Sequence, residues 1–280
     1  MVAKRTDYTA DAVEAARSVL LELTRLLGEY QDGIVIVGGW VPELLLSQAP
    51  RRHIGSLDVD LALDHRTLQK VGYKTIMQLL LACGYRQGEQ PFIFFRTVQL
   101  GGRSLDVEVD FLAGEYAGTT RRHRTQKIQD LHPRKARGCE LAISMATEVT
   151  LRGTLPGGGK DAATLRVSTI VPFLVMKAMA LASRLMEKDA WDIYYCIRYY
   201  PGGISGLVDE FLPHLKNRLV QEALAILGEK FASPEHVGPK HVADFEDITD
   251  SEERVLLQRD AFERVNALLF GLQEAGGAPG

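Results

Sequence analysis

The chain has 280 residues, of which 46% are hydrophobic and 25% charged, with a formal net charge of −3 at pH 7. That length and apolar content suffice for one large or two modest cores, and the slightly negative charge argues against a generally cationic nucleic-acid binder. Cys83, Cys139 and Cys196 are widely spaced and lack metal-ligand spacing, which favours reduced thiols. Without a signal peptide or an apolar run of bilayer length, the sequence predicts a soluble, cytoplasmic protein with no membrane partner.

The first predicted element is an amphipathic helix over residues 8–30. Its apolar residues recur at helical spacing, at Val13, Ala16, Val19, Leu20, Leu23 and Leu27. We expect this helix to cover one face of a sheet.

A short β-branched run at residues 34–37 predicts a buried strand, which Gly38 and Gly39 end at a tight turn. A short helix over residues 42–47 follows. The loop after it is either solvated or contacts an anionic substrate through its basic side chains, Arg51, Arg52 and His53.

Residues 57–63 predict a second strand, on which Asp58 and Asp60 project from the same face. Two like charges about 7 Å apart repel each other, and a divalent cation reverses the sign of that interaction. Hard oxygen ligands of this kind favour Mg²⁺ or Mn²⁺ together with substrate phosphates. The glycine turn before a helix offers N–H groups to those phosphates, so the pattern predicts phosphoryl or nucleotidyl transfer.

Gly38-Gly39 followed by Ser56-x-Asp58-x-Asp60 resembles the signature of the polymerase-beta-like nucleotidyltransferase superfamily. Within it, the arrangement is most similar to the AbiEii/AbiGii-type nucleotidyltransferase toxins, although that branch more often has threonine at the position of Ser56. The resemblance implies an α/β (α+β) fold. We expect a small mixed sheet in a nucleotidyltransferase core, residues 1–169, and a helical C-terminal domain, residues 170–280.

After a helix at residues 66–83, two strands at 92–100 and 104–112 form a predicted hairpin through Gly101-Gly102. The second strand carries three acids on one face, Asp106, Glu108 and Asp110. One of them is expected to be the third carboxylate of a two-metal site, with Asp110 favoured, Asp106 second and Glu108 third. Alternatively, these acids form the solvated face of an edge strand.

A basic stretch spans residues 119–137, where seven cations accompany one acid: Arg121, Arg122, Arg124, Lys127, Arg134, Lys135 and Arg137 against Asp130. It is either a phosphate-contacting patch for an RNA acceptor or a solvated loop, and only Tyr116 lies close by for base stacking. Strands are then predicted at 140–152 and 162–168. The glycine-rich segment between them is not a Walker A loop, because Thr154 and Asp161 replace required residues, so we expect a hairpin tip.

One long helix is predicted from residue 168 or 169 to 199, with Lys177, Arg184 and Lys188 on one face. Lys188-Asp189-Ala190-Trp191-Asp192 is similar to a Lys-Asp-x-x-Asp element of AbiEii-type proteins. That resemblance implies that Lys177 and Lys188 bind triphosphate and that Asp189 or Asp192 orients a lysine or the acceptor. The alternative is an ordinary i,i+4 ion pair between Lys188 and Asp192.

Two further helices, at about 205–231 and 251–273, complete the predicted second domain. The sequence as a whole predicts a metal-dependent nucleotidyltransferase that moves an NMP from an NTP to an acceptor. Its expected residues fall into three sets: Asp58, Asp60 and Asp110 as ligands of Mg²⁺ or Mn²⁺; Gly38, Gly39, Ser56, Lys177 and Arg184 as nucleotide-binding residues; and Lys188 and Asp192 as further catalytic residues.

The resemblance implies a tRNA acceptor and a toxin–antitoxin or phage-defence setting with an antitoxin protein as partner. Two other functions remain open. One is transfer to a small molecule, as in aminoglycoside nucleotidyltransferases. The other is a catalytically silent module that binds a nucleotide or a partner protein.

Overall fold

The structure is a computed structural model that describes residues 4–69, 72–115 and 125–277. The chain is mixed α and β, about 52% helical and 21% strand, and it divides into two compact units. The sheet unit consists of Tyr8–Leu45 and Gly55–Thr169, and the helical unit of Met1–Asp7, Leu46–Ile54 and Ile170–Gly280. Of the residues between the glycine turn and the aspartate strand, Leu46–Ile54 thus belong to the helical unit.

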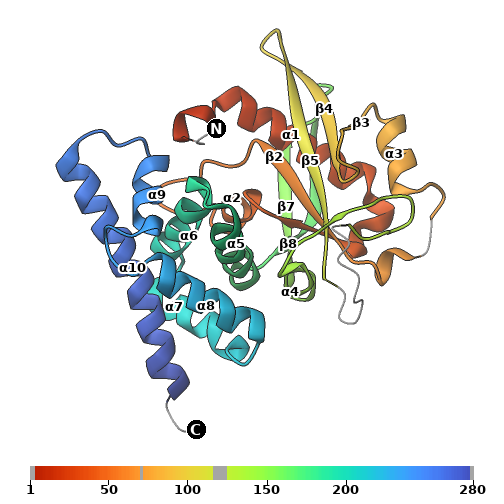
Figure 1. Cartoon of the computed structure of the whole chain (residues 1–280). Helices are drawn as coiled ribbons and strands as arrows, with labels where there is room; N and C mark the ends of the chain where they lie inside the picture. Colours follow the sequence, from red (N-terminus) through yellow and green to blue (C-terminus); the bar gives the residue numbers. More distant parts are fainter. Residues whose placement is uncertain (1–3, 70–71, 116–124, 278–280) are drawn as a thin grey trace. The chain divides into compact units, whose positions relative to one another are not determined.

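The sheet unit contains one mixed sheet (Figure 1), with strands in the order β3-β4-β5-β2-β1-β8-β7 and β6 paired to the end of β5. Its described strands are β1 (Ile34–Val37), β2 (Asp58–Leu63), β3 (Arg86–Gln87), β4 (Ile93–Leu100), β5 (Arg103–Ala113), β6 (Arg134–Lys135), β7 (Ala146–Thr154) and β8 (Lys160–Ser168). Three pairs are parallel, β2–β5, β1–β8 and β5–β6, and the other pairs are antiparallel. The predicted mixed sheet and the two predicted hairpins, β4–β5 and β7–β8, are therefore confirmed.

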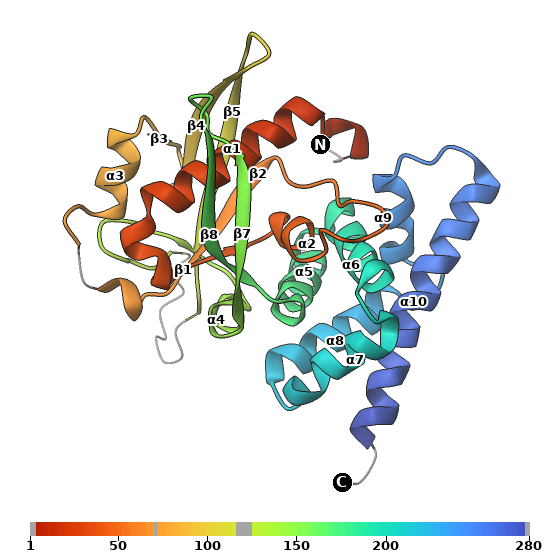
Figure 2. The same ribbon diagram turned by 180° about the vertical axis from the view of Figure 1, so that it is seen from behind.

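Helix α1 (Ala10–Leu26) packs along this sheet against β4, β5, β7 and β8 and crosses its face in Figure 2. Thr9 caps the helix by accepting a hydrogen bond from the backbone N–H of Ala12. The predicted apolar stripe is buried, with Ala16, Val19 and Leu20 at 0% exposure. The remaining helices of the unit are short: α2 (Trp40–Leu45), α3 (Ile76–Ala82) and α4 (Cys139–Ser144), with 3-10 turns η2 (Gly28–Gly33) and η3 (Thr67–Gln69).

Two sequence predictions for this unit were wrong. The helix expected over residues 66–83 is reduced to η3 and α3 among the described residues, and α3 begins at a capping box formed by Thr75 and Gln78. The strand expected from residue 140 begins at Ala146, because residues 139–144 form α4 after Gly138, which has φ 89°. The segment Cys-Glu-Leu-Ala-Ile-Ser lacks the strict alternation that distinguishes a half-buried strand.

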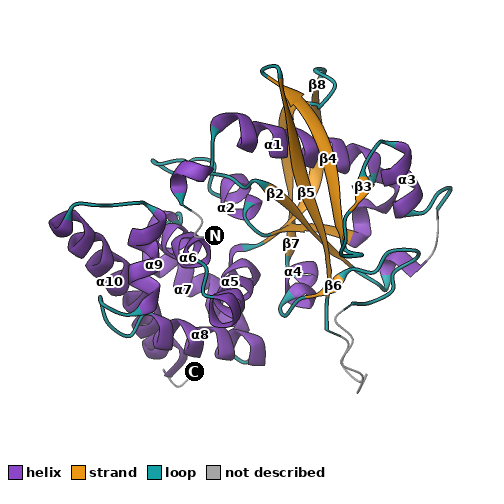
Figure 3. Cartoon of the chain, turned by 45° about the horizontal axis from the view of Figure 1, so that its top comes forward, coloured by secondary structure: helices purple, strands orange, loops and turns teal. Residues whose placement is uncertain are grey.

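The helical unit has no strand among its described residues, as Figure 3 shows. Its helices are α5 (Ile170–Arg184), α6 (Glu187–Tyr199), α7 (Gly203–Phe211), α8 (Arg218–Lys230), α9 (Val237–Phe245) and α10 (Ser251–Gly277), with 3-10 turns η1 (Arg5–Asp7) and η4 (Leu212–His214). Large side chains that are almost fully buried form its core: Phe173, Trp191, Tyr195, Phe211, Phe231 and Phe245. In the described parts of the chain, no helix combines the length and the apolar character needed to cross a membrane.

The single helix predicted to end at residue 199 is in fact two helices, α5 and α6. The break lies at Leu185, whose φ is +49°, a left-handed conformation that an α-helix cannot contain. The long helix predicted over 205–231 is likewise divided, because Pro213 in η4 cannot continue α7 and Asn217 caps a new helix, α8. Helix α9 was not predicted.

We expect Leu185→Gly to be less destabilising than Leu256→Gly by about 2 kcal/mol. The left-handed conformation costs a residue with a Cβ roughly 1–2 kcal/mol, and glycine inside a regular helix costs about 1 kcal/mol. Leu185 is 46% exposed at the α5–α6 joint and Leu256 is 66% exposed within α10, so neither change empties the core. Urea unfolding of both variants measures the difference, and equal losses would contradict a strained joint at Leu185.

Candidate functional site

The acidic residues of β2 and β5 lie side by side in the sheet. These strands pair in parallel, with Asp60 opposite Asp110 and Asp58 opposite Glu108. Paired residues of neighbouring strands are about 4.8 Å apart and project from the same face. The sheet therefore brings four carboxylates together on one face.

The same register separates the three acids that the sequence left as alternatives on β5. Asp110 is the direct neighbour of Asp60, whereas Asp106 lies beyond the start of β2 and pairs instead with Thr97 of β4. The side chain of Asp106 is 53% exposed and accepts a hydrogen bond from Arg86 at 3.0 Å. The geometry thus favours Asp110 as the third carboxylate, with Glu108 next to it, and leaves Asp106 outside the group.

The glycine turn after β1 lies directly against these acids. A Cβ at Gly38 would be 1.8 Å from Asp60 Oδ2, and one at Gly39 would be 2.5 Å from Ser56 Oγ. Gly38 also has φ +68°, a conformation that side chains other than glycine rarely adopt. Ser56 in turn donates a hydrogen bond of 2.5 Å to Asp58 Oδ1. Both glycines therefore provide the space in which the Asp58 and Asp60 side chains are held.

Asp110 is 7% exposed, and one of its oxygens is held by a cation. Arg134 Nη2 on β6 donates to Asp110 Oδ2 at 2.6 Å, and the guanidinium lies 5.7 Å from the centre of the Phe92 ring. Burial, together with the charges of Asp58 and Asp110, raises the pKa of Glu108 above its usual value. The group is thus a partly buried set of like charges, and Arg134 pairs with one of its members.

The donor set fits a hard divalent cation, because carboxylate oxygens are the ligands that Mg²⁺ and Mn²⁺ prefer. In their present rotamers the side chains do not form a closed cage: among the described residues, no group of three or more His, Cys, Asp or Glu could hold a metal ion. Asp58 is turned to Ser56 and Asp110 to Arg134. Backbone pairing nevertheless places Asp60 directly beside Asp110.

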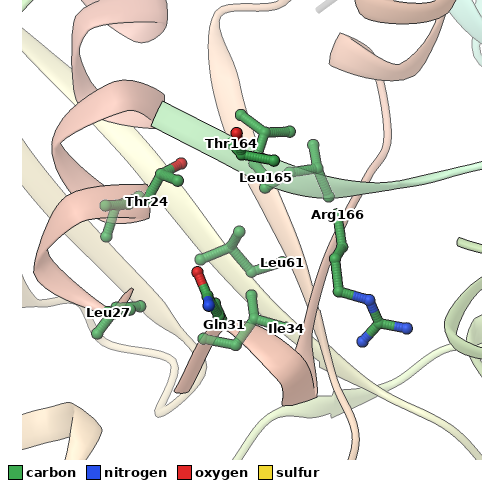
Figure 4. Close-up of a pocket in the computed structure, with 10 residues that line it drawn as sticks. Thr24, Leu27, Gln31, Ile34, Leu61, Thr164, Leu165 and Arg166 are labelled. Carbon is green, nitrogen blue, oxygen red and sulfur yellow. The ribbon is translucent and has the colours of Figure 1, made fainter. Parts of the chain in front are cut away.

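A pocket of the sheet unit lies on the other face of the sheet. Figure 4 shows its lining from α1, β1, β2 and β8, including Thr24, Leu27, Ile34, Leu61 and Thr164. Leu61 alternates with Asp60 along β2 and so projects from the opposite face. The pocket is mostly apolar and contains none of the carboxylates, so we do not assign the chemistry to it.

The predicted cations of the helical unit form an ion-pair cluster in which Lys177 and Lys188 are buried and Arg184 is exposed. Lys177 Nζ of α5 lies 2.8 Å from Asp189 Oδ1 and 2.7 Å from Asp192 Oδ2, both on α6. Arg184 Nε lies 2.7 Å from Asp189 Oδ2, and Lys188 Nζ lies 2.5 Å from Asp192 Oδ1. The i,i+4 pair that the sequence allowed is thus present, but as one part of a larger network. These cations do not share one helix face, because α5 ends before Lys188.

Ion pairing outweighs burial in this cluster. Burial by itself disfavours both charges, but Asp189 and Asp192 raise the pKa of Lys177 above its usual value, and Lys177 with Lys188 lowers the pKa of Asp192. Both aspartates are 0% exposed. The three cations, Lys177, Arg184 and Lys188, face two carboxylates, so the cluster keeps one net positive charge.

His53 belongs to this cluster, and sequence reasoning did not identify it. Its Nε2 lies 2.9 Å from Asp192 Oδ1, and its ring packs 5.0 Å from Trp191 and 4.8 Å from Tyr195, measured between ring centres. Burial, with a contribution from Lys188, lowers the pKa of His53 to about 4. The imidazole is therefore neutral at pH 7 and donates to the carboxylate. A histidine beside two arginines in a loop carries no periodicity that could have revealed this.

The loop that contains His53 is not simply solvated. Arg51 Nη2 lies 2.9 Å from Glu246 Oε2, and the Tyr195 hydroxyl donates to the Arg51 carbonyl at 2.6 Å. Arg52 is exposed. The solvated reading therefore holds for Arg52 and is wrong for His53.

Part of the basic stretch 119–137 lies outside the described residues, including Arg121, Arg122 and Arg124, and so does the neighbouring Tyr116. Of the others, Lys127 is exposed, Arg134 contacts Asp110 and Arg137 Nε lies 3.9 Å from Glu115 Oε2. The RNA-contacting patch remains a prediction.

We compared the chain with protein-family models, with curated proteins and with solved structures, and none matched. The resemblance to AbiEii/AbiGii-type nucleotidyltransferases therefore rests on the motif residues alone.

We expect Gly38→Ala to lower the free energy of unfolding by at least about 2 kcal/mol, because a side chain at φ +68° is strained and its Cβ would overlap Asp60. Gly157→Ala is the matched control, since its Cβ would meet nothing within 4 Å, and we expect it to change stability by less than about 0.5 kcal/mol. Urea unfolding measures both. Equal effects would show that Gly38 is not required by the Asp60 side chain.

The His53 pKa predicts a pH dependence of stability. With a folded pKa of about 4 against a usual value of 6.5, the unfolded chain binds a proton that the folded chain excludes between those values. The contribution is complete above pH 6.5 and is lost as the pH falls toward 4. Relative to His53→Gln, which cannot titrate, wild-type stability should fall by on the order of 2 kcal/mol between pH 7 and 4.5.

The measurement is urea unfolding of both proteins across that pH range. Other titrating groups contribute equally to the two curves and cancel in the difference. Parallel curves would mean that His53 is not held neutral in the folded protein.

Proposed function

We propose that the chain is a metal-dependent nucleotidyltransferase that moves an NMP from an NTP to an acceptor and releases pyrophosphate. We further propose that the sheet unit has the polymerase-beta-like nucleotidyltransferase fold. One observation carries the proposal: Asp58 and Asp60 pair in register with Glu108 and Asp110 on one sheet face, directly against a glycine turn. Such a concentration of carboxylates is costly unless a cation binds there.

Asp58, Asp60 and Asp110 are the residues that would hold Mg²⁺ or Mn²⁺. Bound there, the metal would lower the pKa of the acceptor hydroxyl and neutralise charge on the triphosphate. The backbone at Gly38 and Gly39, which has no Cβ to exclude a ligand, allows phosphate oxygens to approach closely. The acceptor oxygen attacks the α-phosphorus in line, the bond to the bridging oxygen breaks, and pyrophosphate leaves.

Ser56 serves this reaction by fixing an acid. Its hydroxyl donates to Asp58 Oδ1, and a hydrogen bond of this kind orients a metal-ligating carboxylate. In addition, Ser56 Oγ is the group closest to a Cβ at Gly39. Our proposal therefore assigns Ser56 a positioning role in the nucleotide site.

The ion-pair cluster has three cations against two carboxylates, and this net positive charge supports the role that the resemblance implies for the cations. Lys177, Arg184 and Lys188 would contact phosphate oxygens, and Asp189 and Asp192, which they contact here, would orient them. For the acceptor we propose RNA, with tRNA the first choice, in a toxin–antitoxin or phage-defence setting. The AbiEii resemblance and the basic stretch 119–137 support this choice.

The test is incubation of the protein with each α-³²P-labelled NTP, Mg²⁺ and total tRNA. We expect label to enter tRNA from one NTP and the double variant Asp58→Asn with Asp60→Asn to lose on the order of 10³-fold in rate, because the metal supplies several kcal/mol of transition-state stabilisation. Asp106→Asn, on the same strand but outside the carboxylate group, is the matched control and should retain activity.

Label in a small molecule instead of tRNA would keep the mechanism and change the acceptor. Full activity of the double variant would refute the proposal. Mg²⁺-dependent NTP binding without transfer to any supplied acceptor would favour the silent module.

A further inference from the structure

We propose that Arg134 is a positioning residue for the metal site: it holds the Asp110 carboxylate in the orientation that binds the cation. This inference rests on the proposed function, because it takes Asp110 to be a metal ligand. The sequence suggested other roles, placing Arg134 in a basic stretch that either contacts RNA or is a solvated loop. The structure directs its side chain at an acid of the sheet.

Backbone pairing places Arg134 on the carboxylate face. Strand β6 runs parallel to the end of β5, with Arg134 opposite Leu112. Leu112 follows Asp110 by two residues and so projects from the same face. The Ala136 N–H donates to the Ala113 carbonyl at 2.9 Å, which extends the pairing past β6. The position of the guanidinium therefore follows from the sheet and not from a freely moving loop.

The contact uses one oxygen of the carboxylate. Arg134 Nη2 donates to Asp110 Oδ2 at 2.6 Å. A carboxylate can ligate Mg²⁺ or Mn²⁺ through a single oxygen. One oxygen of Asp110 can thus remain on the arginine while the other ligates the cation, as in the outer-shell contacts that orient metal ligands elsewhere.

The contact between Arg134 and Asp110 offsets electrostatic repulsion among the acids. The Asp110 side chain is only 10% exposed, so water is a poor partner for it, and the neighbouring charges of Asp60 and Glu108 repel it. The guanidinium counteracts that repulsion while its face rests on the Phe92 ring, 5.7 Å from the ring centre. Without Arg134, we expect the carboxylate to turn away from Asp60.

A second aspartate of β5, Asp106, also pairs with an arginine from another strand, Arg86 of β3. This pair serves as an internal control. Arg86 Nη2 lies 3.0 Å from Asp106 Oδ2, four residues before Asp110 on the same strand face, and both side chains are more than half exposed. Asp106 is not opposite any residue of β2. Removal of Arg86 therefore deletes a similar ion pair without touching the proposed site.

The experiment is Mn²⁺ titration of the nucleotide-free full chain, with free Mn²⁺ followed by electron paramagnetic resonance. We expect Arg134→Gln to weaken Mn²⁺ binding by about 10–100-fold, the usual effect of removing an outer-shell partner. Arg134→Lys should restore much of the affinity, since one N–H donor is enough for the observed contact. Arg86→Gln should bind as the wild type does. Urea unfolding of each variant confirms that it is folded.

Affinity of Arg134→Gln equal to the wild type would overturn the inference. Tighter binding would also overturn it, because the guanidinium would then be a competitor of the metal. If Arg134→Gln does not fold, Phe92→Leu removes the ring beneath the guanidinium and keeps the charge; weaker Mn²⁺ binding supports the inference, and unchanged binding overturns it. A wild-type chain whose Mn²⁺ binding is absent or insensitive to Asp60→Asn would instead refute the proposed function, and this inference with it.

Discussion

The parallel register between β2 and β5 is the constraint on which the sheet unit depends. On one face it pairs Val59 with Val109 and Leu61 with Phe111, all at most 1% exposed. Burying each such side chain contributes about 1.5–3 kcal/mol, whereas two like charges 4 Å apart in water repel by about 1 kcal/mol. Burial of the apolar face therefore outweighs the charge repulsion, and the register that it fixes places the acids of the other face next to one another. A slip of one residue would turn those acids toward α1.

In the helical unit, the two buried aspartates of the ion-pair cluster are paired with cations. Asp189 contacts Lys177 and Arg184, and Asp192 contacts Lys177 and Lys188. Buried ion pairs of this kind add little net stability, but removal of one member leaves an uncompensated charge. His53 donates to the same carboxylate as a neutral imidazole, so it satisfies Asp192 without adding to the charge. In the sheet unit, by contrast, the acids of β2 and β5 lie beside one another in register.

Features with a strong local pattern could be predicted from the sequence. Alternation predicted β2 and β5, with the acids on one face. The first choice, Asp110, agrees with its register opposite Asp60, whereas Asp106, ranked second, lies beyond β2, and Glu108, ranked third, lies opposite Asp58. The break at Leu185 could not be predicted. Neither glycine nor proline marks it, and leucine rarely adopts the left-handed conformation that it has there. Arg134 was missed because β6 has only two residues, too few for any periodicity. His53 was missed because its partner Asp192 lies 139 residues away.

The carboxylates are held by the protein's own donors, and this explains how a costly group of acids can persist before any ligand arrives. Ser56 donates to one oxygen of Asp58, and Arg134 donates to one oxygen of Asp110. A hydroxyl and a guanidinium differ in charge, and only the second offsets repulsion among the acids. The two donors therefore do different work: Ser56 sets a direction, whereas Arg134 sets a direction and also lowers the electrostatic cost of the site. For the proposed metal site, this reasoning leads us to expect that affinity depends more steeply on Arg134 than on Ser56.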